Sequence, residues 1–191
     1  MKKFLENHGI VYKRSEIKPL LSGKPFIETV RTIQRVYELE GKAEDLAEER
    51  KVILRDVFDR EGIEFIPGFQ GFYREVGNGY KTCIATSTLN ELFKISDEQL
   101  GLTKLFKGNI FTLQDTGCTN KSELFSYAVR KLKSKKKDSI VIEDAPSGVE
   151  AARKAGIRCV ALTTTFDAEK LSKADLVVDS YSQISEYLRR V

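Results

Sequence analysis

The hydrophobic pattern in the first third of the chain has the period of α-helices. Apolar residues recur every three or four positions there, which places them on one face of a helix. One helix is predicted from Pro25, which suits the first helical position, to Gly41, and another from the acidic residues at 44–49 to Gly62. Residues 1–66 are therefore predicted to be helical throughout and to form part of an antiparallel bundle.

The pattern changes at Pro67 and Gly68, where short strand-forming runs begin to alternate with helical segments. This alternation is typical of right-handed crossovers and of a largely parallel sheet covered by helices on both faces. The sequence thus predicts an α/β fold, with a Rossmann-like three-layer core at residues 67–191 and a helical domain at residues 1–66. The predicted strands are 82–85, 110–113, 139–142, 159–163 and 176–178, and the predicted helices lie near 68–76, 89–95, 121–133, 146–155 and 181–190.

Composition narrows the function classes. The chain has 191 residues, of which 41% are hydrophobic and 31% charged, as in an ordinary globular protein. The net charge of +4 is too small to indicate nucleic-acid binding, and the basic run KLKSKKKD at 131–138 has no interleaved aromatic residues, so we interpret it as a solvated helix end. No apolar run is long enough to cross a bilayer, so no membrane partner is predicted. The three cysteines form no metal-ligand spacing, and their odd number does not favour a disulfide framework. Cys83 and Cys159 lie in apolar runs and are predicted to be reduced and buried, which favours a cytoplasmic location.

Polar residues stand directly after the first predicted strand of the core, at the edge where open parallel sheets bind ligands. They are Thr86, Ser87 and Thr88, with Asn90 close behind. Hydroxyl and backbone donors at the start of a helix form a suitable cradle for a phosphoryl group. The alternative is an ordinary hydroxyl cap of the next helix.

A lysine and two acids stand at later strand ends. Lys121 has the charge to neutralise a phosphate, although it could also be one of many surface residues among 32 Lys and Arg. Glu143 and Asp144 offer hard oxygen ligands of the kind that Mg²⁺ accepts together with water and phosphate. Alternatively, Asp144 caps the helix that starts at Pro146 and Glu143 forms a salt bridge. The three features in this order favour a phosphate site with a metal beside it.

The order of these residues resembles a known family. Thr86-Ser87, Lys121 and Glu143-Asp144 resemble the second, third and fourth motifs of the haloacid dehalogenase-like superfamily. The block IEDAPSGVEAARKAGI is similar to the fourth motif of its beta-phosphoglucomutase-like and sugar-phosphatase branch. Residues 1–66 resemble the helical cap domain of this branch, so the resemblance covers essentially the whole chain.

The resemblance implies phosphoryl transfer from a small phosphate ester through an aspartyl-phosphate intermediate, with Mg²⁺ as cofactor. Thr86, with Ser87 and Asn90 beside it, would hold the phosphoryl oxygens. Lys121 would balance the charge of nucleophile and phosphate. Glu143 and Asp144 would hold the metal.

The sequence departs from the family at its first motif. It contains no Asp-x-Asp, and its first aspartate is Asp45, within a predicted helix. No residue therefore stands in for the nucleophile, and the strand that carries it in the family would lie between the strands ending at Ala85 and Ile142. Its omission should leave unpaired backbone groups within the sheet, so we expect the chain as written to be poorly stable or rearranged. We also expect the segment to be supplied elsewhere or to lie upstream of a mis-chosen start codon.

Two function hypotheses follow from this departure. The first is a Mg²⁺-dependent phosphatase of small phosphorylated metabolites that is incomplete as written. The second is a non-catalytic, truncated or degenerate domain that acts by binding or assembly.

Overall fold

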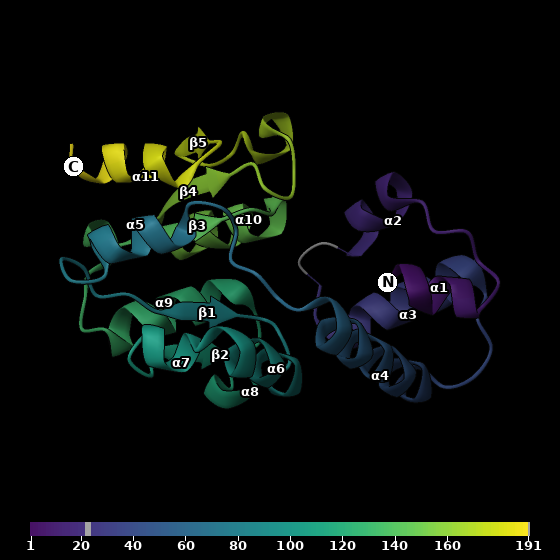
Figure 1. Cartoon of the computed structure of the whole chain (residues 1–191). Coiled ribbons are helices and arrows are strands. Elements are labelled where there is room, and N and C mark those ends of the chain that lie inside the picture. Colours follow the sequence, from purple (N-terminus) through teal and green to yellow (C-terminus); the bar gives the residue numbers. More distant parts are fainter. Residues whose placement is uncertain (22–23, 191) are drawn as a thin grey trace. The chain divides into compact units, whose positions relative to one another are not determined.

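The computed structural model describes residues 1–21 and 24–190, which divide into two compact units (Figure 1). Unit 1 comprises residues 1–63 and 87–101, and unit 2 comprises residues 64–86 and 102–190. The first division falls close to the predicted boundary after residue 66, whereas the grouping of residues 87–101 with the N-terminal helices has no counterpart in the sequence prediction. The assignment of residues 1–66 as a cap and 67–191 as a core remains a prediction.

Unit 1 is built from helices that bury one apolar face. The core consists of Phe4, Leu5, Ile17, Val30, Ile33, Leu46 and Ala47. Pro25 lies one position before its helix rather than within it, and Gly62 ends the long helix as predicted. The helices are α1 (Lys2–Asn7), α2 (Arg14–Leu21), α3 (Phe26–Tyr37), α4 (Ala43–Glu61) and α6 (Asn90–Leu100).

Unit 2 is an α/β unit whose strands match the predicted ones to within two residues at each end. Its strands are β1 (Ile84–Thr86), β2 (Ile110–Thr112), β3 (Ile140–Glu143), β4 (Arg158–Leu162) and β5 (Leu176–Val178). Its helices are α5 (Phe69–Val76), α7 (Leu102–Leu105), α8 (Leu113–Thr116), α9 (Lys121–Lys131), α10 (Pro146–Ala155) and α11 (Tyr181–Leu188), with 3-10 turns at Lys136–Asp138 and Ala168–Leu171.

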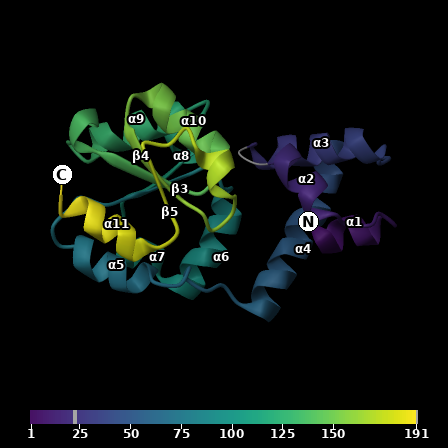
Figure 2. The ribbon, with the colours of Figure 1, turned by 90° about the horizontal axis from the view of Figure 1, so that it is seen from above.

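All strand pairs are parallel, and the strands of the described residues form two sheets. One contains β1 and β2, and the other has the order β3-β4-β5. Helices α9 and α10 cover one face of these sheets, while α5 and α11 lie on the other (Figure 2). The predicted α/β fold with a parallel sheet between helical layers is thus confirmed.

β4 is the most deeply buried strand of unit 2. From Cys159 to Leu162 its residues are at most 3% exposed, because clusters of apolar side chains pack on both of its faces. β1 and β3 are less covered: their residues are half-buried, and Ile142 within β3 is exposed. Within the described chain these two strands are not paired with each other, so the position between them is open.

The helices of the described residues include none that combines the length and the hydrophobicity of a membrane span.

Candidate functional site

The centre of the candidate site is an ion pair between Lys121 and Glu143. Asn120 caps α9 by accepting a hydrogen bond from the Glu123 N–H at 3.0 Å, which fixes Lys121 as the first residue of the helix. Glu143 is the last residue of β3, and its Oε1 pairs with Lys121 Nζ. The Glu143 side chain is only 8% exposed and that of Lys121 is 24% exposed. The surface-lysine alternative for Lys121 therefore does not describe the structure.

Gly148 makes room for the Glu143 carboxylate. This glycine is the third residue of α10, and a Cβ atom there would overlap all three atoms of the carboxylate. The Glu143 side chain consequently lies directly against the first turn of the helix. Its Oε2 also accepts a hydrogen bond from the Asp144 N–H at 3.2 Å.

Asp144 contacts the loop after β4 rather than α9. The Thr165 hydroxyl, in the loop after β4, donates a hydrogen bond to its Oδ2. The N-cap of α10 is Ala145, which has no capping side chain, so Asp144 does not cap the helix. Glu143, in contrast, does form the salt bridge that was its alternative interpretation.

The hydroxyl-rich segment after β1 is divided between the two units. Thr86 ends β1, against which α9 packs, and it belongs to unit 2 together with Lys121, Glu143 and Asp144. Ser87 and Asn90 belong to unit 1. The following helix, α6, has Leu89 at its N-cap, so no hydroxyl occupies the capping position. Of the predicted site residues, Lys121 and Glu143 are thus in direct contact. Asp144 follows Glu143 in the chain, and Thr86 belongs to the same unit.

The negative charge of the two acids acts on neighbouring groups. Burial raises the pKa of the Cys159 thiol to about 12, and the charges of Glu143 and Asp175 add to this effect. Burial also raises the pKa of Tyr181, with a further contribution from the charge of Asp144. The charge of Lys121 acts in the opposite direction on the pKa of Cys159.

Glu143 and Asp144 are the adjacent carboxylates at the end of β3 that a metal could use. Across the part of the chain that the structure describes, no three His, Cys, Asp or Glu side chains form a group that could hold a metal. Mg²⁺ commonly uses one or two carboxylates and takes its other ligands from water and phosphate. The Ser147 hydroxyl, in the first turn of α10, is buried without a hydrogen-bond partner among the described residues, which indicates a polar site with unused capacity.

Sequence reasoning missed Thr165 and Gly148 as parts of this site. Thr165 contacts Asp144 across 21 residues of sequence, and only its position in the polar run TTT after a predicted strand could have indicated it. The sequence shows Gly148 within the APSG block, but it does not show that the Glu143 carboxylate lies against this glycine.

Comparison with known proteins identifies the family. Residues 1–162 match the sequence profile of the haloacid dehalogenase-like hydrolases. The chain belongs to this family, as the order of its motifs predicted.

A curated relative matches a shorter segment. Over 62 residues the chain is 45% identical to validoxylamine A 7'-phosphate phosphatase from Streptomyces hygroscopicus subsp. limoneus. The match covers 32% of this chain and 29% of the relative, so it spans less than a third of that protein.

Solved structures show the same fold over almost the whole chain. A beta-phosphoglucomutase from Clostridium difficile superposes with a TM-score of 0.79 at 24% identity, covering 99% of this chain and 86% of the other. A hydrolase of the family from Deinococcus radiodurans R1, with bound phosphate and sodium, gives a TM-score of 0.75 at 20% identity and the same coverage. At these identities the likeness establishes the fold.

Proposed function

We propose that this chain carries the phosphate- and metal-binding side of a Mg²⁺-dependent phosphatase for small phosphorylated metabolites. The observation that carries the proposal is the Lys121–Glu143 pair at the carboxyl end of β3, with Asp144 next in the chain. Family membership and the partial match to a phosphatase support the same reaction class.

Each residue has a distinct role in this proposal. Lys121 binds a phosphate oxygen through its ammonium group, and Thr86 at the end of β1 donates its hydroxyl to another. Ser87 and Asn90 extend the phosphate cradle. Glu143 and Asp144 would hold Mg²⁺, which would supply charge neutralisation at the phosphate.

The nucleophile is the part that this sequence does not provide. An aspartyl-phosphate mechanism needs a carboxylate in line with the phosphorus, and no Asp-x-Asp is present in the 191 residues. The second candidate function is therefore a non-catalytic domain that binds a ligand or an assembly partner. The Lys121–Glu143 pair favours the first function.

Phosphate binding is the first test. We expect inorganic phosphate with Mg²⁺ to bind the chain, as followed by isothermal titration calorimetry, and Lys121→Met to weaken this binding at least tenfold. Lys104→Met, which removes an exposed lysine of α7, is the matched control and should have no effect. Equal binding by all three proteins would contradict the assigned role of Lys121.

Hydrolysis separates the two candidate functions. The chain and a fusion that adds an apolar strand followed by Asp-x-Asp are assayed with p-nitrophenyl phosphate and Mg²⁺. We expect only the fusion to hydrolyse p-nitrophenyl phosphate. Within the fusion, Lys121→Met should lower kcat/KM about 100-fold, because a donor that stabilises the charge of the transition state is lost. Phosphate binding with no turnover by the fusion would favour the binding domain.

A further inference from the structure

A polar pocket of about 340 Å³ lies along α9 in unit 2. Its walls are the side of α9 from Ser122 to Arg130, the segment 116–118 after α8, Lys136 of the 3-10 turn, and residues 154–155 at the end of α10. Helices α9 and α10 pack against each other on the same face of the sheets (Figure 2). We call this cavity the α9–α10 pocket. It is separate from the candidate site, because neither Lys121 nor Glu143 lines it.

Three basic side chains from three different elements line the α9–α10 pocket. Arg130 lies in the last turn of α9, Lys136 begins the 3-10 turn, and Lys154 lies in the last turn of α10. All three are exposed, and none forms an ion pair with an acid among the described residues. Three positive charges thus surround one cavity without a carboxylate bound to them.

Two carboxylates lie near the pocket, and both have other partners. Glu123 lines it at the start of α9, where its Oε2 accepts hydrogen bonds from the Thr119 N–H at 2.9 Å and hydroxyl at 3.0 Å. Its Oε1 accepts one from the Asn120 amide at 3.0 Å. Glu150 of α10 pairs with Arg153 at 2.8 Å. The cations of the pocket are therefore available to an anion from solution.

Hydroxyl groups line the rest of the pocket. Ser122 and Ser126 lie one turn apart on α9, are half-buried, and form no side-chain hydrogen bond with another described residue. They can donate hydrogen bonds to a polar ligand. The volume is close to the lower end of those of ligand sites, which indicates a small ligand.

The three cations suit an anion with several charged oxygens. A guanidinium group can bind two phosphate oxygens at once, whereas each ammonium group acts as a point charge. Side chains that approach from three elements can each bind a different oxygen of a diphosphate group. A single phosphate offers fewer oxygens and less charge for the same set.

We propose that the α9–α10 pocket binds a small anion that carries a diphosphate group. Arg130, Lys136 and Lys154 bind the diphosphate oxygens, and Ser122 and Ser126 donate hydrogen bonds within the remaining space. The inference is independent of the proposed phosphatase function, because it uses no residue of that site.

Pyrophosphate is the probe, and isothermal titration calorimetry of the full chain in EDTA measures its binding. EDTA removes the Mg²⁺ that the proposed phosphatase site requires. We expect pyrophosphate to bind at least tenfold more tightly than inorganic phosphate. Lys136→Gln and Lys154→Gln should each weaken its binding about tenfold, because each removes one charge-assisted hydrogen bond. Equal affinity for the two anions would overturn the proposal.

Lys137→Gln is the matched control. Lys137 follows Lys136 in the same 3-10 turn and is also exposed, but it does not line the pocket. It should change the affinity less than twofold. Equal weakening by Lys136→Gln and Lys137→Gln would show diffuse attraction to the basic run 131–138, as for a nucleic acid, and would overturn the proposal. Unchanged urea midpoints of both variants would exclude a loss of folding.

Lysine acylation followed by mass spectrometry locates the bound anion. Pyrophosphate should slow the reaction of Lys136 and Lys154 and leave that of Lys137 unchanged. Protection of Lys121 alone would place the anion in the candidate phosphate site and overturn the proposal.

Adenosine diphosphate distinguishes two sources of the diphosphate group. Affinity equal to or above that of pyrophosphate would support an organic diphosphate as the ligand. Affinity at least tenfold lower would support the free anion.

Discussion

At the scale of single residues, Gly148 determines how much space the Glu143 carboxylate has. A methyl group at this position would overlap the carboxylate, which is buried and paired with Lys121. We predict that Gly148→Ala forces Glu143 out of its place and lowers the free energy of unfolding by about 1–3 kcal/mol, the usual cost of overpacking. Urea denaturation measures the change.

The matched control for this prediction is Gly71→Ala. Gly71 is the third residue of α5, as Gly148 is of α10, but a Cβ atom there has no neighbour within 4 Å. It should be neutral or stabilising by up to about 1 kcal/mol, because alanine favours the helix. Similar destabilisation by both substitutions would show that the helix position, rather than contact with Glu143, matters.

Burial of the Cys159 thiol makes the free energy of unfolding depend on pH. Its pKa is raised from 9.0 to about 12 by burial and by nearby carboxylates. The folded state therefore keeps the thiol proton above pH 9, where the unfolded state loses it, and unfolding becomes more favourable as the pH rises. We predict that the stability difference between the unaltered chain and Cys159→Ala shifts by about 1–2 kcal/mol in favour of the variant between pH 8 and pH 10.5. A difference independent of pH, in urea titrations at both values, would contradict this.

At the scale of secondary-structure elements, the Lys121–Glu143 pair connects α9 to the end of β3. Since Glu143 is 8% exposed, removal of its partner would leave a buried charge uncompensated. We predict that Lys121→Met costs about 3 kcal/mol of stability and that adding Glu143→Gln restores most of it. The exposed Lys94–Glu98 pair of α6 is the control, and Lys94→Met should cost less than about 1 kcal/mol.

A double variant no more stable than Lys121→Met alone would contradict this account. Such a result would show that the lysine stabilises α9 through other contacts. One such contact is its ammonium group over the Phe125 ring, at 5.7 Å from the ring centroid.

The elements themselves were largely predictable because their signals are local. Apolar periodicity and end residues such as Gly62 and Pro146 place the main helices, and β-branched runs place the strands. α2 lies within the region that was predicted to be helical, but its bounds were not predicted; Pro19 lies inside this helix, and Ile17 packs in the core of unit 1. The order of Lys121, Glu143 and Asp144 was visible in the sequence, and their role in a phosphate and metal site stays a prediction. Their contacts could not be predicted. The Thr165–Asp144 bond depends on how distant loops meet.

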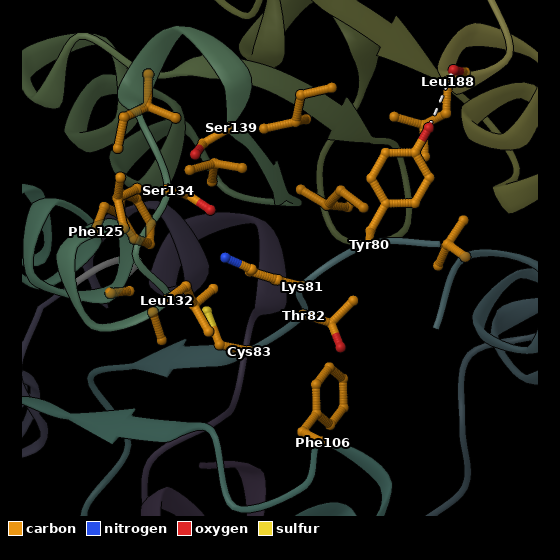
Figure 3. Close-up of a pocket in the computed structure, with 18 of the residues that line it drawn as sticks. Tyr80, Lys81, Thr82, Cys83, Phe106, Phe125, Leu132, Ser134, Ser139 and Leu188 are labelled. Atoms are coloured by element: carbon orange, nitrogen blue, oxygen red, sulfur yellow. Dashed lines mark hydrogen bonds between the residues drawn. The ribbon is translucent and has the colours of Figure 1, made fainter. Parts of the chain in front are cut away.

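At the scale of the whole molecule, the two sheets of unit 2 should differ in local stability. β4 lies between β3 and β5 and is covered on both faces, whereas β1 has one partner strand and lines a cavity that residues of β3 also line (Figure 3). An amide exchanges through the least costly opening that exposes it, and an edge strand beside a cavity opens with fewer lost contacts. The separation into two sheets therefore predicts two levels of protection within one unit.

Hydrogen exchange under native conditions measures this difference. We predict that the amides of β4 from Val160 to Leu162 exchange at least tenfold more slowly than those of β1 and β2, and that only β4 follows global unfolding as urea is added. Equal protection of β1 and β4 in the free chain would mean that the two sheets already open as one cooperative unit, and that the cavity between them has no effect on the stability of its edges.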